Sequence, residues 1–497
     1  MKLRELLKPI PEKWIVRSNA GNPEIADIAC DSRKVSKDSL FFAIKGMVTD
    51  GLKFIPEAIG KGAAGVISEE PAPAQFDKTW IQVRSIRKVM AACSACFYGY
   101  PAGKIELTGI TGTNGKTTTA YILHSILSVE SPSLLLGTVT TSIGNLREEA
   151  GLTTPESIDL HRILARAAEN EISQGVMEVS SHALAFDRVY GMGFPTAVFT
   201  NLTADHLDFH KDLDDYFAIK SRLFDPSLNK TLHHAVVNLD DPYGVVLAES
   251  ASAETLSYGL DSRADIYPDS VESGINGISM ELISPWGRTP VTSSLCGKHN
   301  IYNIMAAFGA AAARGISAEQ TADGIRSLPA VPGRFQKLDL DLPWAVILDY
   351  AHTPDALKNV LELARSVCDR RIISVFGCGG DRDVRKRPVM ANIGISGSDI
   401  AILTSDNPRT EDPDKIIADM KAGITGELAG RAWEIITDRR SAIARALEIA
   451  EAGDLVLLAG KGHEDYQVLG TEKVPFDEEL IVREISVSYT HLRAHET

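Results

Sequence analysis

The chain has 497 residues, more than one ordinary hydrophobic core accommodates, which indicates about three domains. Hydrophobic residues make up 44% and charged residues 24%, which excludes a disordered chain, and the formal net charge of −15 argues against a general binder of nucleic acids or membrane surfaces. No stretch approaches the ~20 apolar residues that span a bilayer, and no signal peptide is recognised. We therefore expect a cytoplasmic protein.

The first hundred residues combine short β-like runs with glycine-rich loops. Ser39–Ile44 and Gly65–Ile67 are predicted strands, since both are apolar and bounded by turn residues. A Pro/Gly break at Tyr100–Lys104 (YPAGK) indicates a boundary. We predict an N-terminal domain over residues 1–100.

A different rhythm follows, in which apolar strands end in glycine or threonine and amphipathic helices come after them. The predicted strands of this part are Ile105–Ile110, Gly175–Val179, Thr196–Thr200 and Ala235–Asn238. Such alternation predicts an α/β fold with a mostly parallel sheet covered on both faces. A second break at Leu328–Arg334 (LPAVPGR) closes a central domain over residues 101–330.

A second α/β series begins beyond this break and defines a C-terminal domain over residues 331–486. Its predicted strands are Ala345–Leu348, Arg371–Phe376, Ile400–Thr404 and Leu455–Ala459. Ligands of open α/β sheets bind at the carboxyl ends of strands, so the polar loops there are candidate sites. Residues 487–497 have neither apolar period nor caps, and we leave them out of the fold prediction as a candidate non-native tail.

The segment Ile105–Thr119 (IELTGITGTNGKTTT) has the order strand, Gly/Thr loop, Lys-Thr and helix that a phosphate-binding loop requires. Glycines at 112 and 115 let backbone N–H groups approach phosphate oxygens without a Cβ in the way. Ile110 stands where the first glycine of the motif belongs, so the match is imperfect, but nucleotide binding is favoured over a plain Gly-rich turn. The predicted nucleotide contacts are Gly112, Thr113, Asn114, Gly115, Lys116, Thr117 and Thr118.

An acid at the end of a strand accompanies this loop. Met177–His182 (MEVSSH) places Glu178 late in a predicted strand. Mg²⁺ prefers hard oxygen ligands, so Glu178 and the hydroxyl of Thr117 make a plausible magnesium site. The alternative is a buried strand acid with a local partner, and the phosphate loop shifts the balance toward metal.

Thr111–Thr118 (TGTNGKTT) resembles the ATP loop of the Mur ligase family, and the likeness extends over nearly the whole chain. The resemblance implies three domains: one for a UDP moiety, a central P-loop ATPase domain, and a C-terminal Rossmann-like domain for an incoming amino acid. It implies ATP and Mg²⁺ as cofactors. It also implies a catalytic set of Lys116, Glu178, His206 and Lys220, with Thr117, Glu178, His206 and a carbamylated Lys220 as metal ligands. Carbamylation makes sense of a lysine there, since it replaces a cation by an anionic oxygen ligand.

Three further segments resemble ATP contacts of the family. They are Gly297–Asn303 (GKHNIYN), Pro332–Phe335 (PGRF) and Leu348–Pro354 (LDYAHTP). An Arg and an Asp beside a domain break are more often an interdomain salt bridge, but the motifs favour nucleotide contact. The residues implied are His299, Asn300, Asn303, Arg334 and Asp349, with His352 beside them.

Other segments resemble the family's contacts to a UDP-muramoyl substrate. Asp31–Gly46 (DSRKVSKDSLFFAIKG) resembles the uridine-binding segment, and the run after it resembles a second contact. Leu152–Glu156 (LTTPE) resembles the muramoyl-peptide contact. Phe186 stands where the motif usually has a polar residue, so either the substrate grip differs there or this position does not contact ligand. The residues implied are Ser32, Met47, Val48, Thr49, Thr153, Thr154, Ser180 and Arg188.

Ser405–Arg409 (SDNPR) follows a predicted strand and combines acceptors for an ammonium with a guanidinium for a carboxylate. Diaminopimelate has both groups at its distal end, whereas lysine has only the ammonium, so Arg409 is the discriminating residue. Alone, the motif would be an Asx/Pro turn with a solvent-facing arginine. Two further motifs, GGDRD and GKGHEDYQ, match the diaminopimelate pocket of the family, which implies Arg382, Asp406, Asn407, Pro408, Arg409, Gly460 and Glu464.

The activity that the resemblance implies is ATP-dependent ligation of meso-2,6-diaminopimelate to UDP-N-acetylmuramoyl-L-alanyl-D-glutamate, through an acyl phosphate, in peptidoglycan precursor biosynthesis. The expected partners are these small molecules alone, with no nucleic acid and no membrane. We expect the chain to be a monomer. A folylpolyglutamate or D-Ala-D-Ala-adding ligase is disfavoured by the SDNPR, GGDRD and LTTPE segments. A regulatory P-loop ATPase would explain the phosphate loop but not the C-terminal motifs.

Overall fold

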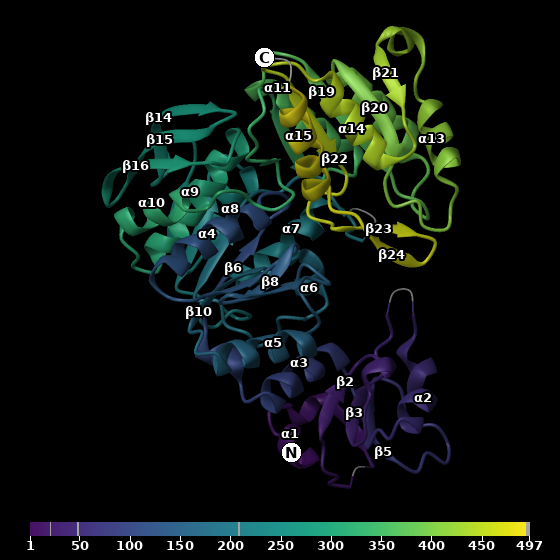
Figure 1. Cartoon of the computed structure of the whole chain (residues 1–497). Helices are drawn as coiled ribbons and strands as arrows, with labels where there is room; N and C mark the ends of the chain where they lie inside the picture. Colours follow the sequence, from purple (N-terminus) through teal and green to yellow (C-terminus); the bar gives the residue numbers. More distant parts are fainter. Residues whose placement is uncertain (20, 47–48, 207–208, 494–497) are drawn as a thin grey trace. The chain divides into compact units, whose positions relative to one another are not determined.

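The structure is a computed structural model that describes residues 1–19, 21–46, 49–206 and 209–493 (Figure 1). The chain forms two compact units. The first consists of Met1–Pro268, Ile283–Thr289 and Tyr302–Ile325, and the second holds the remaining described residues. Among the described residues, no helix combines the length and the apolar character that a bilayer span requires.

The N-terminal part of the first unit is built on a five-stranded sheet of order β1-β5-β4-β3-β2. Both strands predicted here are confirmed, as β3 and β4, and every residue of the two is buried. The elements are α1 (Leu3–Leu6), β1 (Ile15–Ser18), β2 (Asp27–Ala29), β3 (Ser39–Phe42), α2 (Ile55–Gly60), β4 (Gly65–Ser68), β5 (Thr79–Val83) and α3 (Ile86–Phe97).

The predicted parallel sheet is confirmed in the same unit, with strand order β13-β12-β11-β6-β10-β7-β8-β9. Its strands pair in parallel from β13 to β7, whereas β8 and β9 add an antiparallel edge that the sequence did not predict. The strands are β6 (Glu106–Thr111), β7 (Leu134–Leu136), β8 (Thr140–Ile143), β9 (Leu146–Glu149), β10 (Gln174–Glu178), β11 (Thr196–Phe199), β12 (His234–Asn238) and β13 (Glu254–Tyr258). The helices that lie wholly in this unit are α4 (Lys116–Glu130), α5 (Ser157–Glu169), α6 (Ser181–Ala185), α7 (Leu213–Ser221) and α8 (Pro242–Ser250). Helices α9 (Lys298–Ala313) and α10 (Ala318–Arg326) belong to it over Tyr302–Ile325.

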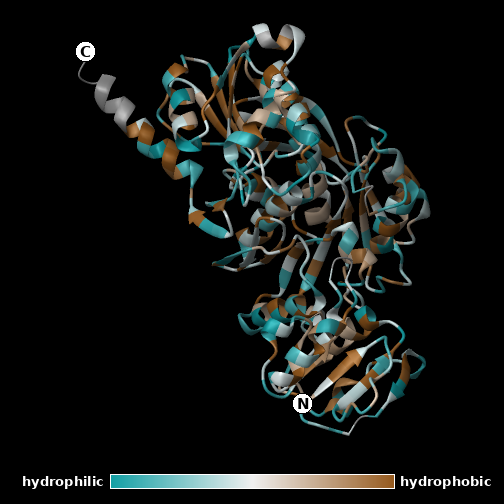
Figure 2. Ribbon diagram, turned by 90° about the vertical axis from the view of Figure 1, so that its right-hand side faces the viewer, coloured by the Kyte–Doolittle hydropathy of each residue, from teal (hydrophilic) through white to brown (hydrophobic). Residues whose placement is uncertain are grey.

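The central strands are buried along almost their whole length, as expected for a parallel sheet covered on both faces. Brown, hydrophobic segments recur along strands in Figure 2. The register places Glu178 opposite Ile110, and Phe199 opposite Thr111. The carboxyl ends of β6, β10 and β11 therefore meet at one edge, where the Gly112–Gly115 loop begins.

A separate three-stranded sheet is formed by β14 (Tyr267–Gly274), β15 (Gly277–Ser284) and β16 (Gly287–Ser293). Its strands are partly exposed, and β15 and β16 have buried residues that alternate with less buried ones. None of these three strands was predicted, because none is a continuous apolar run.

The C-terminal sheet of the second unit has the order β17-β18-β22-β19-β20-β21, and its predicted strands are confirmed. For example, the strand expected at Arg371–Phe376 runs from Ile372 to Cys378. The elements are β17 (Gln336–Lys337), β18 (Ala345–Asp349), α11 (Pro354–Val367), β19 (Ile372–Cys378), α12 (Lys386–Gly397), β20 (Ile400–Ser405), α13 (Pro413–Lys421), β21 (Ala432–Ile435), α14 (Arg439–Ile449), β22 (Leu455–Ala459), β23 (Tyr466–Leu469), β24 (Glu472–Pro475) and α15 (Glu478–Arg493). Helix α15 extends into residues 487–493, for which no element was predicted.

Candidate active site

The predicted phosphate loop joins β6 to α4. Gly112 and Gly115 both have positive φ angles, at 146° and 83°, which residues with a Cβ rarely adopt. A Cβ on Gly112 would collide with the Thr200 hydroxyl, and one on Gly115 with the Asn303 amide. Helix α4 begins at Lys116, directly after the loop, and Gly115 forms its N-cap. The loop therefore presents the N-terminus of a long helix, which favours anions.

Glu178 lies at the carboxyl end of β10 and is fully buried. Its Oε2 accepts hydrogen bonds from Thr117 Oγ1 at 2.9 Å and Thr138 Oγ1 at 3.1 Å, and its Oε1 accepts one from the Thr138 N–H at 2.8 Å. Thr138 was missed by the sequence analysis. Its signal was its place just after the apolar strand β7, at the same sheet edge as Glu178.

Lys220 and His206, the other two predicted metal ligands, flank Tyr216. Lys220 is 1% exposed, its Nζ donates to the Gly112 carbonyl at 2.7 Å, and it lies 4.5 Å from the Tyr216 ring centroid. Burial, and after it the charge of Lys116, keep the pKa of Lys220 well below its ordinary value. The ring centroids of His206 and Tyr216 lie 6.5 Å apart, and the side chain of His206 is half exposed.

The oxygen atoms around Glu178 suit Mg²⁺. Thr117, Thr138 and Glu178 bring oxygen atoms together, which is the donor chemistry that Mg²⁺ selects. The described residues contain no cluster of three or more His, Cys, Asp or Glu side chains that could bind a metal by itself. The oxygen set fits a site that nucleotide phosphates complete, and Lys220 as a free amine does not belong to it.

The predicted muramoyl-peptide contacts lie beside Glu178. Thr153 Oγ1 is 3.1 Å from Thr138 Oγ1, and Thr154 Oγ1 donates to the Glu178 carbonyl at 2.8 Å. Ser180 donates its backbone N–H to Thr154 Oγ1 at 3.1 Å. One continuous set of hydroxyls therefore connects the predicted substrate segment to the acid at the phosphate loop.

Arg188 is held by this same segment, since its guanidinium donates to Glu156 Oε1 at 2.8 Å and to the Thr154 carbonyl at 2.9 Å. Its charge is thus partly engaged by the protein. Phe186, which departs from the motif, packs against Arg87, whose guanidinium carbon lies 4.4 Å from the ring centroid.

Of the predicted uridine contacts, Ser32 is buried and donates to Glu57 Oε2 at 2.8 Å. Thr49 is exposed, and its carbonyl accepts a hydrogen bond from the Gly46 N–H. Met47 and Val48 lie outside the described residues.

The three predicted contacts on α9 differ in their surroundings. Asn303 accepts a hydrogen bond from Thr119 Oγ1 at 3.3 Å, which places it at the phosphate loop helix. Asn300 donates to the Cys296 carbonyl at 2.8 Å, and His299 is exposed.

Asp349 ends β18 in the second unit and accepts hydrogen bonds from the N–H groups of Phe335 and Ala351, at 2.7 and 2.8 Å. Burial raises the pKa of Asp349 above its ordinary value. The Arg334 guanidinium lies 5.5 Å from the Tyr350 ring centroid. Both residues thus adjoin the start of the loop after β18.

A pocket of about 210 Å³ opens among the carboxyl ends of β18, β19, β20 and β22. Every residue predicted for the amino-acid site lines this pocket except Pro408. Lys386 was missed; its signal was the basic run VRKR. The lining residues are Tyr350, His352, Thr353, Gly379, Arg382, Lys386, Asp406, Asn407, Arg409, Gly460 and Glu464.

Lys461, also missed, is a fully buried cation behind this pocket. Its Nζ donates to Asn407 Oδ1 at 3.1 Å and Glu464 Oε2 at 3.2 Å, and Asn407 Nδ2 donates to the same Glu464 oxygen at 2.9 Å. Asp406 is 5% exposed, and its Oδ1 accepts no hydrogen bond from the described residues. That oxygen also lies 3.8 Å from Lys461 Nζ, so it pairs with a buried cation while its hydrogen-bonding capacity stays unused by the described residues.

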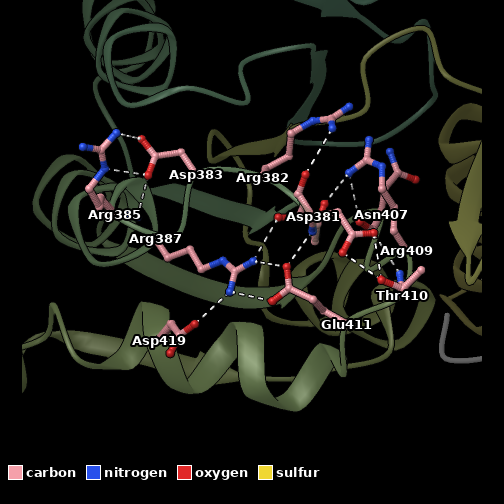
Figure 3. Close-up of polar contacts among 12 residues, drawn as sticks. Asp381, Arg382, Asp383, Arg385, Arg387, Asn407, Arg409, Thr410, Glu411 and Asp419 are labelled. Carbon is pink, nitrogen blue, oxygen red and sulfur yellow. Dashed lines mark hydrogen bonds and ion pairs between the residues drawn. The ribbon is translucent and has the colours of Figure 1, made fainter. Parts of the chain in front are cut away.

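The two pocket arginines come from two loops that lie against each other (Figure 3). Arg409 Nη1 donates to the Gly380 carbonyl at 2.8 Å, and Arg382 Nη1 donates to the Asp381 carbonyl at 3.2 Å. Among the described residues, neither arginine forms an ion pair with an acid. Both guanidinium charges therefore remain available to a carboxylate.

Comparison with known proteins agrees with this geometry. Three family models match the chain: "Mur ligase family, catalytic domain" over residues 24–98, "Mur ligase middle domain" over 110–311, and "Mur ligase, glutamate ligase domain" over 333–462.

Two relatives are both named UDP-N-acetylmuramoyl-L-alanyl-D-glutamate--2,6-diaminopimelate ligase. The relative from Solibacter usitatus is 44% identical, over 98% of this chain and 99% of its own. The relative from Alkaliphilus metalliredigens is 42% identical, over 98% of each chain. A solved structure of a ligase of the same name matches with a TM-score of 0.69 and 33% identity, over 99% of both chains. The chain belongs to the Mur ligase family.

Proposed function

We propose that this chain is an ATP-dependent ligase that attaches meso-2,6-diaminopimelate to UDP-N-acetylmuramoyl-L-alanyl-D-glutamate. The observation that carries the proposal is the pocket in which Arg382 and Arg409 stand with Asp406 and Glu464. Two guanidinium groups and two acids suit a carboxylate and an ammonium on one carbon, which diaminopimelate has at its distal end. The names of the full-length relatives support the same substrate.

The work is divided among three domains in this proposal. Residues 1–100 bind the UDP moiety through Ser32 and the run from Met47 to Thr49. Residues 101–330 bind ATP, and residues 331–486 bind the incoming amino acid. His299, Asn300, Asn303, Arg334 and Asp349 complete the nucleotide site.

In the first step, the terminal carboxylate of the muramoyl dipeptide attacks the γ-phosphorus of ATP, the bond to ADP breaks, and an acyl phosphate forms. Lys116 and the N–H groups of the phosphate loop offset the negative charge that moves between phosphate oxygens. Thr117, Glu178 and Thr138 would hold Mg²⁺, with His206 and a carbamylated Lys220 for a second ion. Bound Mg²⁺ neutralises phosphate charge.

In the second step, the uncharged amine of diaminopimelate attacks the acyl carbon, and inorganic phosphate leaves as the amide forms. Arg382 and Arg409 hold the distal carboxylate, and Asp406 and Glu464 hold the distal ammonium. The other amine of diaminopimelate is thereby directed toward the acyl phosphate. Positioning of this kind supplies much of the rate enhancement, and no nucleophilic side chain is required.

The site needs only small molecules and residues of one chain, so we also infer a monomer that works in the cytoplasm, where ATP and UDP-sugars are available. Light scattering of the purified protein at assay concentration tests the first inference. A dimer would contradict it.

The proposed function is tested by phosphate release from ATP with the two other substrates added singly and together. We expect release to require both the UDP-muramoyl dipeptide and diaminopimelate. Release that ignores both compounds would instead indicate a regulatory ATPase.

A further inference from the structure

Arg387 is a fully buried arginine, on the second residue of α12, next to the pocket but not in it. Its Nη2 donates to Glu411 Oε1 at 2.7 Å and its Nη1 to Glu411 Oε2 at 3.0 Å, which makes a two-pronged ion pair. Nη1 also donates to Asp419 Oδ2 at 2.8 Å, and Nη2 to the Gly379 carbonyl at 3.4 Å (Figure 3).

These contacts connect the two loops that carry the pocket arginines. Gly379 belongs to the loop of Arg382, and Glu411 lies two residues after Arg409 in the same loop. Glu411 closes the connection, because its Oε1 also accepts a hydrogen bond from the Asp381 N–H. The buried Arg387 and the partly exposed Glu411 thus form a bridge between the loops.

The loops need such a bridge because their backbones are unfavourable by themselves. Asp381 and Arg409 both have φ near +52°, a left-handed conformation that costs free energy in residues with a side chain. Gly380 approaches the Pro408 carbonyl so closely that a Cβ would collide with it. The side chain of Asp381 also accepts from Thr410 Oγ1, at 2.8 Å.

The chain supplies a natural comparison in Arg385, two residues before Arg387. Its side chain is 88% exposed, and its ion pair is with Asp383, its neighbour in the same loop. Arg385 has the same charge and nearly the same place in the sequence, but it bridges no loops.

We propose that Arg387 is a positioning residue for amino-acid selection: through Glu411 it fixes the separation and direction of Arg382 and Arg409, so that both reach one carboxylate. This inference rests on the proposed function. A guanidinium displaced by about 1 Å loses most of its geometric advantage, so a loosened bridge weakens binding of the distal carboxylate more than binding of the other substrates.

The test uses the full-length variants Arg387→Ala, Arg387→Lys and Glu411→Gln, with Arg385→Ala as the matched control. For each, kcat and KM are measured for diaminopimelate and for lysine, with the thermal midpoint beside them. The informative quantity is the ratio of kcat/KM for the two amines, because a smaller folded fraction lowers both values equally and leaves the ratio unchanged.

We expect Arg387→Ala to raise KM for diaminopimelate about tenfold or more and to lower the ratio by a similar factor, with KM for ATP and the muramoyl dipeptide within about twofold. Arg387→Lys and Glu411→Gln should fall between this variant and the wild type, and Arg385→Ala should match the wild type. If Arg387→Ala does not fold, the kcat/KM ratios of Arg387→Lys and Glu411→Gln test the positioning role instead.

An unchanged ratio in the bridge variants, with the wild type preferring diaminopimelate, would overturn the positioning role alone. A wild type that does not use diaminopimelate would overturn the proposed function itself.

Discussion

The hydroxyl of Thr117 donates a hydrogen bond to Oε2 of Glu178 at 2.9 Å, and the Glu178 side chain is fully buried. The first turn of α4 is therefore joined to the end of β10. These two residues lie 61 positions apart in the sequence, and the parallel pairing of β10 with β6 brings them together.

Replacing Glu178 by Gln tests the magnesium role of this edge. The variant keeps the shape of the side chain but removes its charge, so we expect kcat to fall about 100-fold or more and the Mg²⁺ concentration for half-maximal rate to rise. Titration of Mg²⁺ in the phosphate-release assay measures both. Glu148→Gln, at an exposed ion pair on β9, is the control and should leave both values unchanged. Normal Mg²⁺ dependence in Glu178→Gln would leave Glu178 as a structural acid.

Lys220 is expected to be carbamylated in the active enzyme. Burial lowers the pKa of Lys220, which increases the uncharged fraction of the amine. An uncharged amine can add CO₂, release a proton and become an anionic carbamate. We expect Lys220→Arg, which stays cationic, to lose about 100-fold or more of kcat.

Intact-protein mass spectrometry under mild conditions and activity after removal of CO₂ check the modification itself. Lys211→Arg, at an exposed lysine before α7, is the control. Wild-type activity that is indifferent to bicarbonate, together with an active Lys220→Arg variant, would rule the carbamate out.

His161 makes the stability of the protein depend on pH. It is 2% exposed, neither ring nitrogen has a hydrogen-bond partner among the described residues, and burial lowers its pKa from 6.5 to about 4. Between these values the unfolded state binds a proton that the folded state does not. Stability should therefore fall as the pH falls from 6.5 to 4, by up to ~1.4 kcal/mol per pH unit from this residue.

Urea unfolding at several pH values measures this slope. We expect His161→Gln to reduce the dependence of stability on pH. Part of this dependence should persist, because burial also lowers the pKa of His124 to about 4. His233→Gln, at an exposed histidine, should retain the wild-type slope. Equal slopes in all three proteins would mean that His161 does not remain uncharged in the fold.

The sequence was sufficient to predict the central strands and to place the candidate site residues at their ends. Continuous apolar runs such as Leu455–Ala459 have a single reasonable interpretation, and the phosphate loop lies between a strand and a helix as its motif requires. Strands β14 to β16 were missed, because they are partly exposed and lack the continuous apolar runs from which the central strands were predicted.

Buried charged residues were the other omission, since no local pattern distinguishes them from surface residues. The acids that pair with Arg387 lie 24 and 32 positions further along the chain, and Asn407 lies 54 positions before Lys461. Only the packing of β19, β20 and β22 brings these partners together. Their positions beside the pocket could not be deduced from spacing.

The amine preference of the Arg409→Ala variant tests the central claim most directly. One charge-assisted pair with the distal carboxylate contributes ~1.5–3 kcal/mol, so we expect kcat/KM for diaminopimelate to fall about 10- to 100-fold while the lower value for lysine stays nearly constant. Unchanged turnover and an unchanged preference for diaminopimelate would show that another group recognises the distal carboxylate, and the assignment of this pocket would fail.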